Sequence, residues 1–303
     1  MNGLSVILPT YNRAAMIERA LDSVHRQTVA CDEIIVVDDG STDYTYDVVS
    51  SFSRKCDIPV RYFRQKNRGP AAARNRAVRE ARCPLIAFLD SDDHWQKKKV
   101  EIQKKSMLEN PEYLISHTQE RWFRRGEHLN QKSIHRPRNG HIFDHCLKLC
   151  AVGMSTVMLR KELFEAVGMF NERLRCCEDY DFWLRCSWKL EFLLVAEALT
   201  VKEGGRDDQV SHQYRIGMDR FRIFSIADLL DREPLSPSQR ELALTELRRK
   251  CSVYGKGCMK HGRSSPGKKA LKLAEWAEDM LQHAGSNISV PQKLIPVPDA
   301  ESW

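Results

Sequence analysis

The sequence between residues 33 and 43 reads Glu33-Ile34-Ile35-Val36-Val37-Asp38-Asp39-Gly40-Ser41-Thr42-Asp43. An unbroken run of β-branched apolar residues that ends at turn-forming residues predicts a short strand buried on both faces. Such strands are typical of parallel sheets with helices packed on each side. The acidic residues come directly after the strand, at its carboxyl end, where open parallel sheets bind their ligands.

The segments on both sides of this run repeat the alternation of strand and helix. Further buried strands are predicted at residues 4–8, 60–63 and 84–89. Helices are predicted at 13–27, where apolar residues recur at helical spacing, after a cap at Ser41 or Thr42, and from Gly69-Pro70 onward. This alternation predicts an α/β fold built from βαβ units, with one mostly parallel sheet flanked by helices.

The pattern loosens after Trp95 and becomes helical near the end of the chain. Helices are expected at 97–109, 161–167 and 178–190, and strands at 113–117, 153–159 and 192–202. Residues 121–141 are rich in Arg, His, Asn and Gly and are expected to form an irregular loop. Three further helices are expected near 217–231, 237–260 and 266–284, followed by a tail without clear periodicity.

Composition excludes several classes of protein. The 303 residues are 42% hydrophobic and 29% charged, which is ordinary for a globular chain and excludes disordered and collagen-like proteins. The longest apolar runs are far shorter than the ~20 residues that span a bilayer, and no signal peptide is evident at the start, so a cytoplasmic protein is expected. A net charge of +7 fits an anionic ligand, an acidic membrane surface or nucleic acid. The ten scattered cysteines favour reduced thiols over a disulfide framework or a metal site.

Two acidic segments suggest ligand chemistry. A buried carboxylate at Asp39 could accept a hydrogen bond from the imide N–H of uracil or thymine; alternatively, the turn exists only so that Ser41 and Asp43 cap the next helix. The segment Asp90-Ser91-Asp92-Asp93 places three carboxylates in four residues. Such a group suits Mg²⁺ or Mn²⁺ together with substrate phosphates, although acidic residues are also favoured at a helix N-terminus.

A third segment, Asn67 to Asn75, lies between these two in the sequence. Its alanines allow close approach of backbone and ligand, and Arg74 could reach a phosphate or a ribose. The alternative is an alanine-rich packing helix with a solvated arginine.

These segments together resemble glycosyltransferase family 2, whose members have the GT-A fold and transfer sugars from nucleotide donors with inversion. The resemblance is carried, in order, by residues 6–13, 36–43, 67–75 and 88–93, and it extends over about residues 1–215. It implies that Asp92 binds the metal and that a further set of residues lies at the donor nucleotide: Pro9, Thr10, Tyr11, Arg13, Asp39, Asn67, Gly69, Arg74, Asp90 and Ser91.

The resemblance also assigns residues in the second half of the chain. The segment Cys177-Glu178-Asp179-Tyr180 matches the catalytic Glu-Asp pair of the family, with Asp179 as the base and Glu178 beside it. An acidic first turn of a helix is the alternative explanation. Related sequences often carry a histidine after a Gly-Gly pair, near the metal and the diphosphate. Arg206 stands at that position here and His212 lies six residues on, so either is a candidate for the diphosphate, and His212 also for the metal.

The resemblance implies an inverting transferase that uses Mn²⁺ or Mg²⁺. Its donor would be a nucleotide sugar, most of all a UDP-sugar, and its acceptor a sugar or lipid-linked sugar. Such a transferase would act in the synthesis of bacterial surface polysaccharide or glycolipid. Residues 1–95 would be the nucleotide-binding half, 96–215 the acceptor half, 216–285 a helical extension and 286–303 a tail. Basic clusters at 121–138, 248–250 and 268–269 suggest contact with the inner face of the membrane, or simply solvated surfaces. No RNA-recognition signature is present, and no nucleic acid partner is expected. A sugar-phosphate nucleotidyltransferase and a non-catalytic nucleotide-sugar-binding scaffold remain alternatives.

Overall fold

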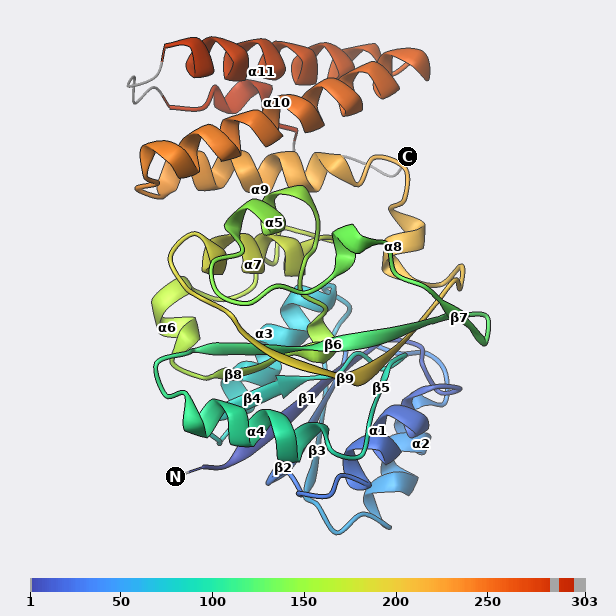
Figure 1. Ribbon diagram of the computed structural model, residues 1–303. Helices are drawn as coiled ribbons and strands as arrows, with labels where there is room; N and C mark the ends of the chain where they lie inside the picture. The colour runs from blue at the N-terminus through green and yellow to red at the C-terminus, as the bar shows by residue number, and fades with distance from the viewer. Residues whose placement is uncertain (1, 284–288, 297–303) are drawn as a thin grey trace. The chain divides into compact units, whose positions relative to one another are not determined.

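The computed structural model describes residues 2–283 and 289–296 (Figure 1). The chain divides into two compact units. The first unit comprises residues 1–141, 152–172 and 190–206, and the second comprises 142–151, 173–189 and 207–303. The first unit holds the sheet, and the second consists of helices and their connections. The division into residues 1–215, 216–285 and 286–303 follows motifs rather than contacts and stays a prediction.

All strands of the described residues belong to one sheet in the first unit. Its order is β3-β2-β1-β4-β8-β6-β9-β5, with β7 paired to β6. The pairs β1–β2, β2–β3, β1–β4 and β6–β9 are parallel, and the antiparallel pairs involve the short strands β5, β7 and β8. The strand bounds are β1 Leu4–Thr10, β2 Glu33–Asp38, β3 Val60–Arg64, β4 Leu85–Phe88, β5 His94–Trp95, β6 Ile115–Arg124, β7 Glu127–Leu129, β8 Met158–Arg160 and β9 Leu193–Gly204.

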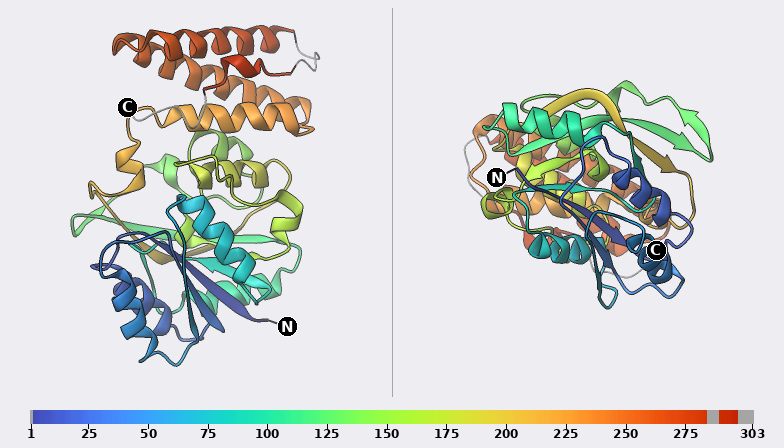
Figure 2. Two further views of the ribbon diagram at one scale, coloured as in Figure 1. Left: turned by 180° about the vertical axis from the view of Figure 1, so that it is seen from behind. Right: turned by 90° about the horizontal axis from the view of Figure 1, so that it is seen from below.

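Helices cover both faces of this sheet. Alternate residues of β1, namely Leu4, Val6 and Leu8, share one buried apolar cluster with residues of α1, α2 and α4. Helix α3 contacts β1 and β2 and lies on the opposite face, nearest the viewer when the molecule is seen from behind (Figure 2). The helix bounds in this unit are α1 Ile17–His25, α2 Thr45–Ser53, α3 Pro70–Glu80, α4 Lys99–Glu109 and α6 Leu163–Val167. The predicted α/β class with a mostly parallel sheet is confirmed.

Three local predictions are wrong. Residues 121–141 are not one irregular loop, because β6 continues to Arg124 along β9, β7 pairs back onto it, and Ser133–His135 form a 3-10 helix. Backbone pairing with a neighbouring strand outweighs the polar local sequence there. Residues 153–159 are partly 3-10 helix, at Met154–Thr156. The helix after β2 has no Ser41 or Thr42 cap.

The second unit is formed by helices whose bounds are α5 Phe143–Lys148, α7 Glu178–Ser187, α8 Val210–Gln213, α9 Asp219–Arg232, α10 Pro237–Lys260 and α11 Ser264–Gln282. Ser236 and Gln239 form a capping box that starts α10. Helices α10 and α11 cross closely at Gly255 and Gly267, where a Cβ on Gly255 would lie 2.8 Å from the Leu271 side chain. Of the predicted tail, Gln292–Leu294 form a 3-10 helix, while residues 284–288 and 297–303 lie outside the described part. Among the helices described, none is long and apolar enough to cross a bilayer.

Candidate functional site

The ends of β1 and β2 bring Thr10 and Asp39 together. The Asp39 backbone N–H donates to the Thr10 carbonyl at 2.8 Å, as a continuation of the parallel ladder. Both residues are only 4% exposed. The Thr10 hydroxyl is buried and has no hydrogen-bond partner within the described residues. Because buried hydroxyls in native proteins are nearly always paired, this atom marks a place where a ligand's polar group fits.

The Asp39 carboxylate organises the loop before α3. It accepts hydrogen bonds from the Gln65 side chain at 2.8 Å and from the backbone N–H groups of Arg68 and Gly69 at 3.0 and 2.7 Å. Burial raises the pKa of Asp39. Asp39 therefore fixes both sides of Asn67 and contacts Gly69 directly, and these are two of the predicted donor residues.

The neighbouring Asp38 has a different, structural role. Its carboxylate accepts from the Ser41 backbone N–H at 2.7 Å and from the Tyr62 hydroxyl. Burial and that hydrogen bond raise the pKa of Tyr62. Asp38 closes the turn after β2, so only Asp39 of the acidic pair remains a ligand candidate.

The loop after β1 is tied to the loop after β2. The Asn12 backbone N–H donates to the Ser41 hydroxyl at 2.8 Å, and the Arg13 N–H donates to the Thr45 hydroxyl at 3.0 Å. Ser41 therefore serves this loop rather than capping a helix. Pro9 is buried in β1, while Tyr11 is 44% exposed. The predicted residues Pro9 to Arg13 thus run from the sheet core to the surface.

Helix α3 carries Arg74 inward. Gly69 has a φ of 90°, a conformation that favours glycine, and Pro70 begins the helix. Arg74 is only 5% exposed, so the alternative of a solvated arginine is wrong. Its guanidinium donates to Oδ1 of Asp90 at 2.8 Å and lies over the Phe170 ring.

The acidic segment after β4 is held by different partners at each residue. Asp90 pairs with Arg74, as described above, and Asp92 pairs with Arg206 at 2.6 Å between Nη2 and Oδ2. Asp93 is buried and accepts from the Ser155 hydroxyl at 2.7 Å. Burial, and then the charge of Asp92, raise the pKa of Asp93 well above its usual range. Two arginines therefore neutralise the segment, and Asp93 belongs to the core.

Two residues around this segment carry no signal in the local sequence. Arg19 on α1 donates to the Asp92 carbonyl at 2.8 Å and pairs with Glu203 at 2.6 Å. The Ser155 hydroxyl accepts from the Asp90 N–H at 3.0 Å while it donates to Asp93. Each is remote in sequence from the acidic segment, and only the fold brings it there.

A divalent cation can be tested against these donors. No group of three or more His, Cys, Asp or Glu side chains suited to a metal occurs in the described residues. Mg²⁺ and Mn²⁺ sites that also use substrate phosphates need only one or two carboxylates. The Asp92 side chain is 18% exposed and offers hard oxygen atoms, so it fits that role once Arg206 moves from Oδ2.

The other predicted residues lie in the second unit. Helix α7 starts at Glu178, after Cys177 in a left-handed conformation with φ of 63°. Glu178 is 6% exposed, whereas Asp179 is half-buried. The Asp179 carboxylate accepts from the Tyr180 N–H at 2.7 Å and from the Cys150 thiol at 3.2 Å. His212 lies on α8, 3.7 Å from Asp207.

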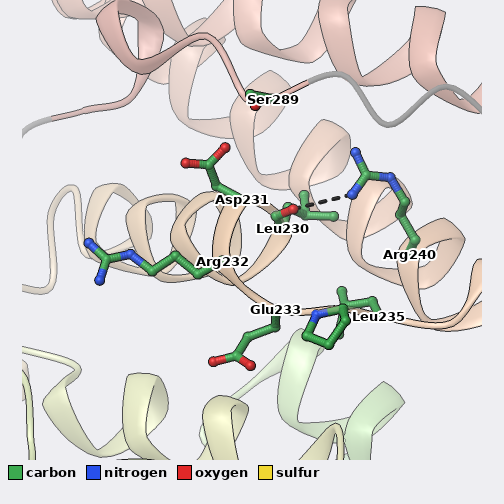
Figure 3. A pocket seen from close by; sticks show the side chains of 8 residues that line it. Leu230, Asp231, Arg232, Glu233, Leu235, Arg240 and Ser289 are labelled. Atoms are coloured by element: carbon green, nitrogen blue, oxygen red, sulfur yellow. Dashed lines mark hydrogen bonds between the residues drawn. The ribbon is translucent and has the colours of Figure 1, made fainter.

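A hollow of about 400 Å³ in the second unit contains none of the predicted residues (Figure 3). It lies where α9 ends and α10 begins, and Arg240 donates there to the Leu230 carbonyl at 3.2 Å. The side chains of Asp231, Arg232 and Glu233 point in different directions and do not converge on one point. The hollow therefore offers no organised set of binding groups.

Comparisons with known proteins agree with the order of segments along the chain. Residues 5–168 match the family model described as glycosyl transferase family 2. An uncharacterized glycosyltransferase of Rickettsia felis is 34% identical over 252 residues, which are 81% of this chain and 41% of that protein. A second relative is the UDP-Glc:alpha-D-GlcNAc-diphosphoundecaprenol beta-1,3-glucosyltransferase WfgD of Escherichia coli. It is 35% identical over 186 residues, which are 60% of this chain and 68% of the Escherichia coli protein.

A solved structure shows the same fold. The mannosyltransferase PcManGT from Pyrobaculum calidifontis, in complex with GDP-Man and Mn²⁺, has a TM-score of 0.65 at 19% identity and covers 93% of this chain and 76% of its own. That likeness establishes the GT-A fold. The chain spans about two fifths of the length of the Rickettsia relative. With the family model matching more than half of its residues, the chain belongs to glycosyl transferase family 2.

Proposed function

We propose that this chain is an inverting glycosyltransferase that moves a sugar from a nucleoside diphosphate, above all UDP, to an acceptor hydroxyl. The observation that carries the proposal is the buried Thr10 hydroxyl, which has no hydrogen-bond partner in the part of the chain that the structure describes, although the Thr10 carbonyl accepts from the Asp39 N–H. The resemblance to the family implies that the nucleobase of the donor lies beside these two residues. UDP is favoured because the Escherichia coli relative is named for a UDP-Glc donor.

The nucleobase end of the donor would be held by Asp39 and Thr10. Asp39 already accepts from three donors that fix the loop, and the Arg68 N–H is shared between both of its oxygens, so about four acceptor positions are used. The imide N–H of uracil would take the place of the longer Arg68 contact, which is 3.2 Å from Oδ2. The Thr10 hydroxyl can donate to a base carbonyl, which would satisfy its own hydrogen-bonding capacity. Tyr11, exposed at the end of this loop, can pack on the base.

The diphosphate would meet the two arginine–aspartate pairs. Arg74 is held by Asp90 at 2.8 Å and is already oriented, whereas Arg206, now 2.6 Å from Asp92, would be released beside the diphosphate when a cation takes that carboxylate. Arginine binds phosphate oxygens through two parallel hydrogen bonds. Arg206 is therefore a stronger candidate for the diphosphate than His212, which lies 3.7 Å from Asp207. We keep Asp92 as the ligand of Mn²⁺ or Mg²⁺, which when bound would stabilise the negative charge of the leaving group.

Asp179 would act as the general base. It takes the proton of the acceptor hydroxyl while the acceptor oxygen forms a bond to the anomeric carbon, and the bond from that carbon to the diphosphate breaks. Inversion follows because the nucleophile attacks from the side opposite the leaving group. Its greater exposure favours Asp179 over the buried Glu178.

The acceptor class is proposed from the relatives. The Escherichia coli relative is named for a sugar on diphosphoundecaprenol, so a sugar or lipid-linked sugar is the expected acceptor, in the synthesis of bacterial surface glycans. A cytoplasmic location at the inner face of the membrane fits such an acceptor and stays a prediction, as does contact of basic residues with the membrane.

The test is a donor assay on the purified chain. Release of UDP or GDP from a panel of UDP- and GDP-sugars is measured with Mn²⁺, with Mg²⁺ and with EDTA, without acceptor and then with lipid-linked sugars. We expect UDP-sugars to be turned over and T10V and D39N to weaken them selectively. Conversion of a UDP-sugar and added pyrophosphate to UTP and a sugar 1-phosphate would instead identify a nucleotidyltransferase, and no binding of any nucleotide sugar would contradict the proposal.

A further inference from the structure

The thiol of Cys150 contacts the carboxylate that we propose as the base. Its Sγ lies 3.2 Å from Oδ2 of Asp179. The other oxygen, Oδ1, accepts from the Tyr180 backbone N–H at 2.7 Å. Both carboxylate oxygens therefore have a fixed partner, and the orientation of the group is set by two donors from different segments.

Two buried contacts fix the segment that carries Cys150. Cys150 follows the end of α5, where the Tyr180 hydroxyl donates to the Leu147 carbonyl at 2.7 Å. The Lys250 ammonium donates to the next carbonyl, that of Lys148, at 3.1 Å. Tyr180 and Lys250 are each 1% exposed. The approach of Cys150 to Asp179 therefore does not depend on a mobile surface side chain.

We propose that Cys150 is a positioning residue for Asp179. Its S–H group donates to Oδ2 and holds the carboxylate with its remaining lone pairs directed at the acceptor hydroxyl. Each carboxylate oxygen can accept two hydrogen bonds, so one position on Oδ1 and one on Oδ2 stay open for that hydroxyl. This role rests on the proposed function, because it presumes that Asp179 takes a proton in sugar transfer.

Several titratable groups surround Cys150 and Asp179. Cys177, the residue before α7, interacts electrostatically with Asp179 and with Arg222 of α9, and Arg222 interacts with Asp219 and Cys150. Burial opposes the charge of Arg222, while the nearby acidic groups outweigh it and raise the pKa of Arg222. The charge of Arg222 therefore acts on Cys150 and Cys177, and a variant that removes the Cys150 thiol retains this arginine.

The first test measures the contact and needs no catalysis. The intact chain is treated with iodoacetamide, and alkylation of each cysteine is followed by mass spectrometry of peptides in wild type and D179N. Only thiolate reacts, and a neighbouring carboxylate keeps the thiol protonated, so Cys150 should react at least about threefold faster in D179N. Cys56, also half-buried but in the first unit, is the internal control and should react at the same rate in both. An unchanged Cys150 rate overturns the proposal.

The second test measures positioning. In C150A, kcat should fall about tenfold, equivalent to about 1.4 kcal/mol, with the KM for the donor unchanged; C150S, which keeps a donor, should recover most of the loss. C56A is the matched control and should behave as wild type. A purely structural role would affect the alanine and serine variants alike, and that result, or a normal kcat in C150A, overturns the proposal. If wild type itself transfers no sugar, the proposed function fails, while the alkylation rates still decide the contact.

Discussion

The guanidinium of Arg206 lies 2.6 Å from Oδ2 of Asp92, although 114 residues separate the two in the sequence. The carboxylate proposed to hold a cation is thus already paired with a cation from the protein. Arg206 stands where related sequences often carry a histidine. A histidine could share a metal with Asp92, whereas an arginine cannot bind one and competes for the same oxygen.

Replacement of Arg206 should separate metal binding from donor binding. In R206Q, Asp92 loses its internal partner, so Mn²⁺ should bind more tightly in the absence of nucleotide, while UDP should bind about tenfold more weakly with Mn²⁺ present because one phosphate contact is lost. Paramagnetic resonance of free Mn²⁺ and calorimetry with UDP measure the two effects. H212Q serves as the comparison variant, and a larger loss of UDP affinity there would transfer the role to His212.

Replacement of Thr10 should weaken the donor without weakening the fold. T10V keeps the shape of the side chain but removes a buried hydroxyl that has no partner in the described residues. We expect the free energy of unfolding to stay the same or rise, because no hydrogen bond is broken, and UDP affinity to fall by about 0.5–1.5 kcal/mol. Urea unfolding and calorimetry measure these. A destabilised variant with normal UDP affinity would show that the hydroxyl has a purely structural role.

Replacement of Asp179 should affect catalysis alone. D179N keeps the size of the side chain but cannot accept the proton, so kcat should fall by about 10²–10⁴-fold with little change in donor affinity. The matched variant is E178Q, which alters the buried neighbour. Steady-state kinetics with calorimetric donor binding separates the two, and a near-normal kcat in D179N with a large loss in E178Q would reverse the assignment.

Lys99 should make the stability of the fold depend on pH. It is fully buried, its ammonium contacts the Gln103 side chain, and burial lowers its pKa from 10.5 to about 7. Below about pH 7 both folded and unfolded chains hold the proton. Between that pH and 10.5 only the unfolded chain holds it, so the free energy of unfolding should rise with pH across this window.

The measurement for Lys99 is a difference between two proteins. Urea unfolding of wild type and K99M at several pH values from 6 to about 10 cancels the other titrating groups, which are common to both. The stability of wild type relative to K99M should increase as the pH is raised through the window. A difference that stays constant with pH would show that Lys99 keeps its proton in the folded state.

The first ninety residues were predictable because strands buried on both faces leave an unbroken apolar pattern, as in residues 34–37. The pattern fails for residues 121–124, which are polar and yet continue β6, since their pairing with β9 is a property of the neighbouring strand. The order of the polar segments along the chain was also readable, and with it the family.

The sequence by itself determined the α/β class, the family and the candidate residues, because the burial pattern and the order of segments are local properties of the chain. Only the tertiary structure decided which of those residues face one another. In the folded chain Arg206 pairs with Asp92, and the Cys150 thiol donates to Asp179. Asp38 accepts from the Tyr62 hydroxyl, whereas Asp39 accepts from the loop before α3. The physical reason is that a carboxylate's partners depend on the paths of distant segments, which no local spacing records.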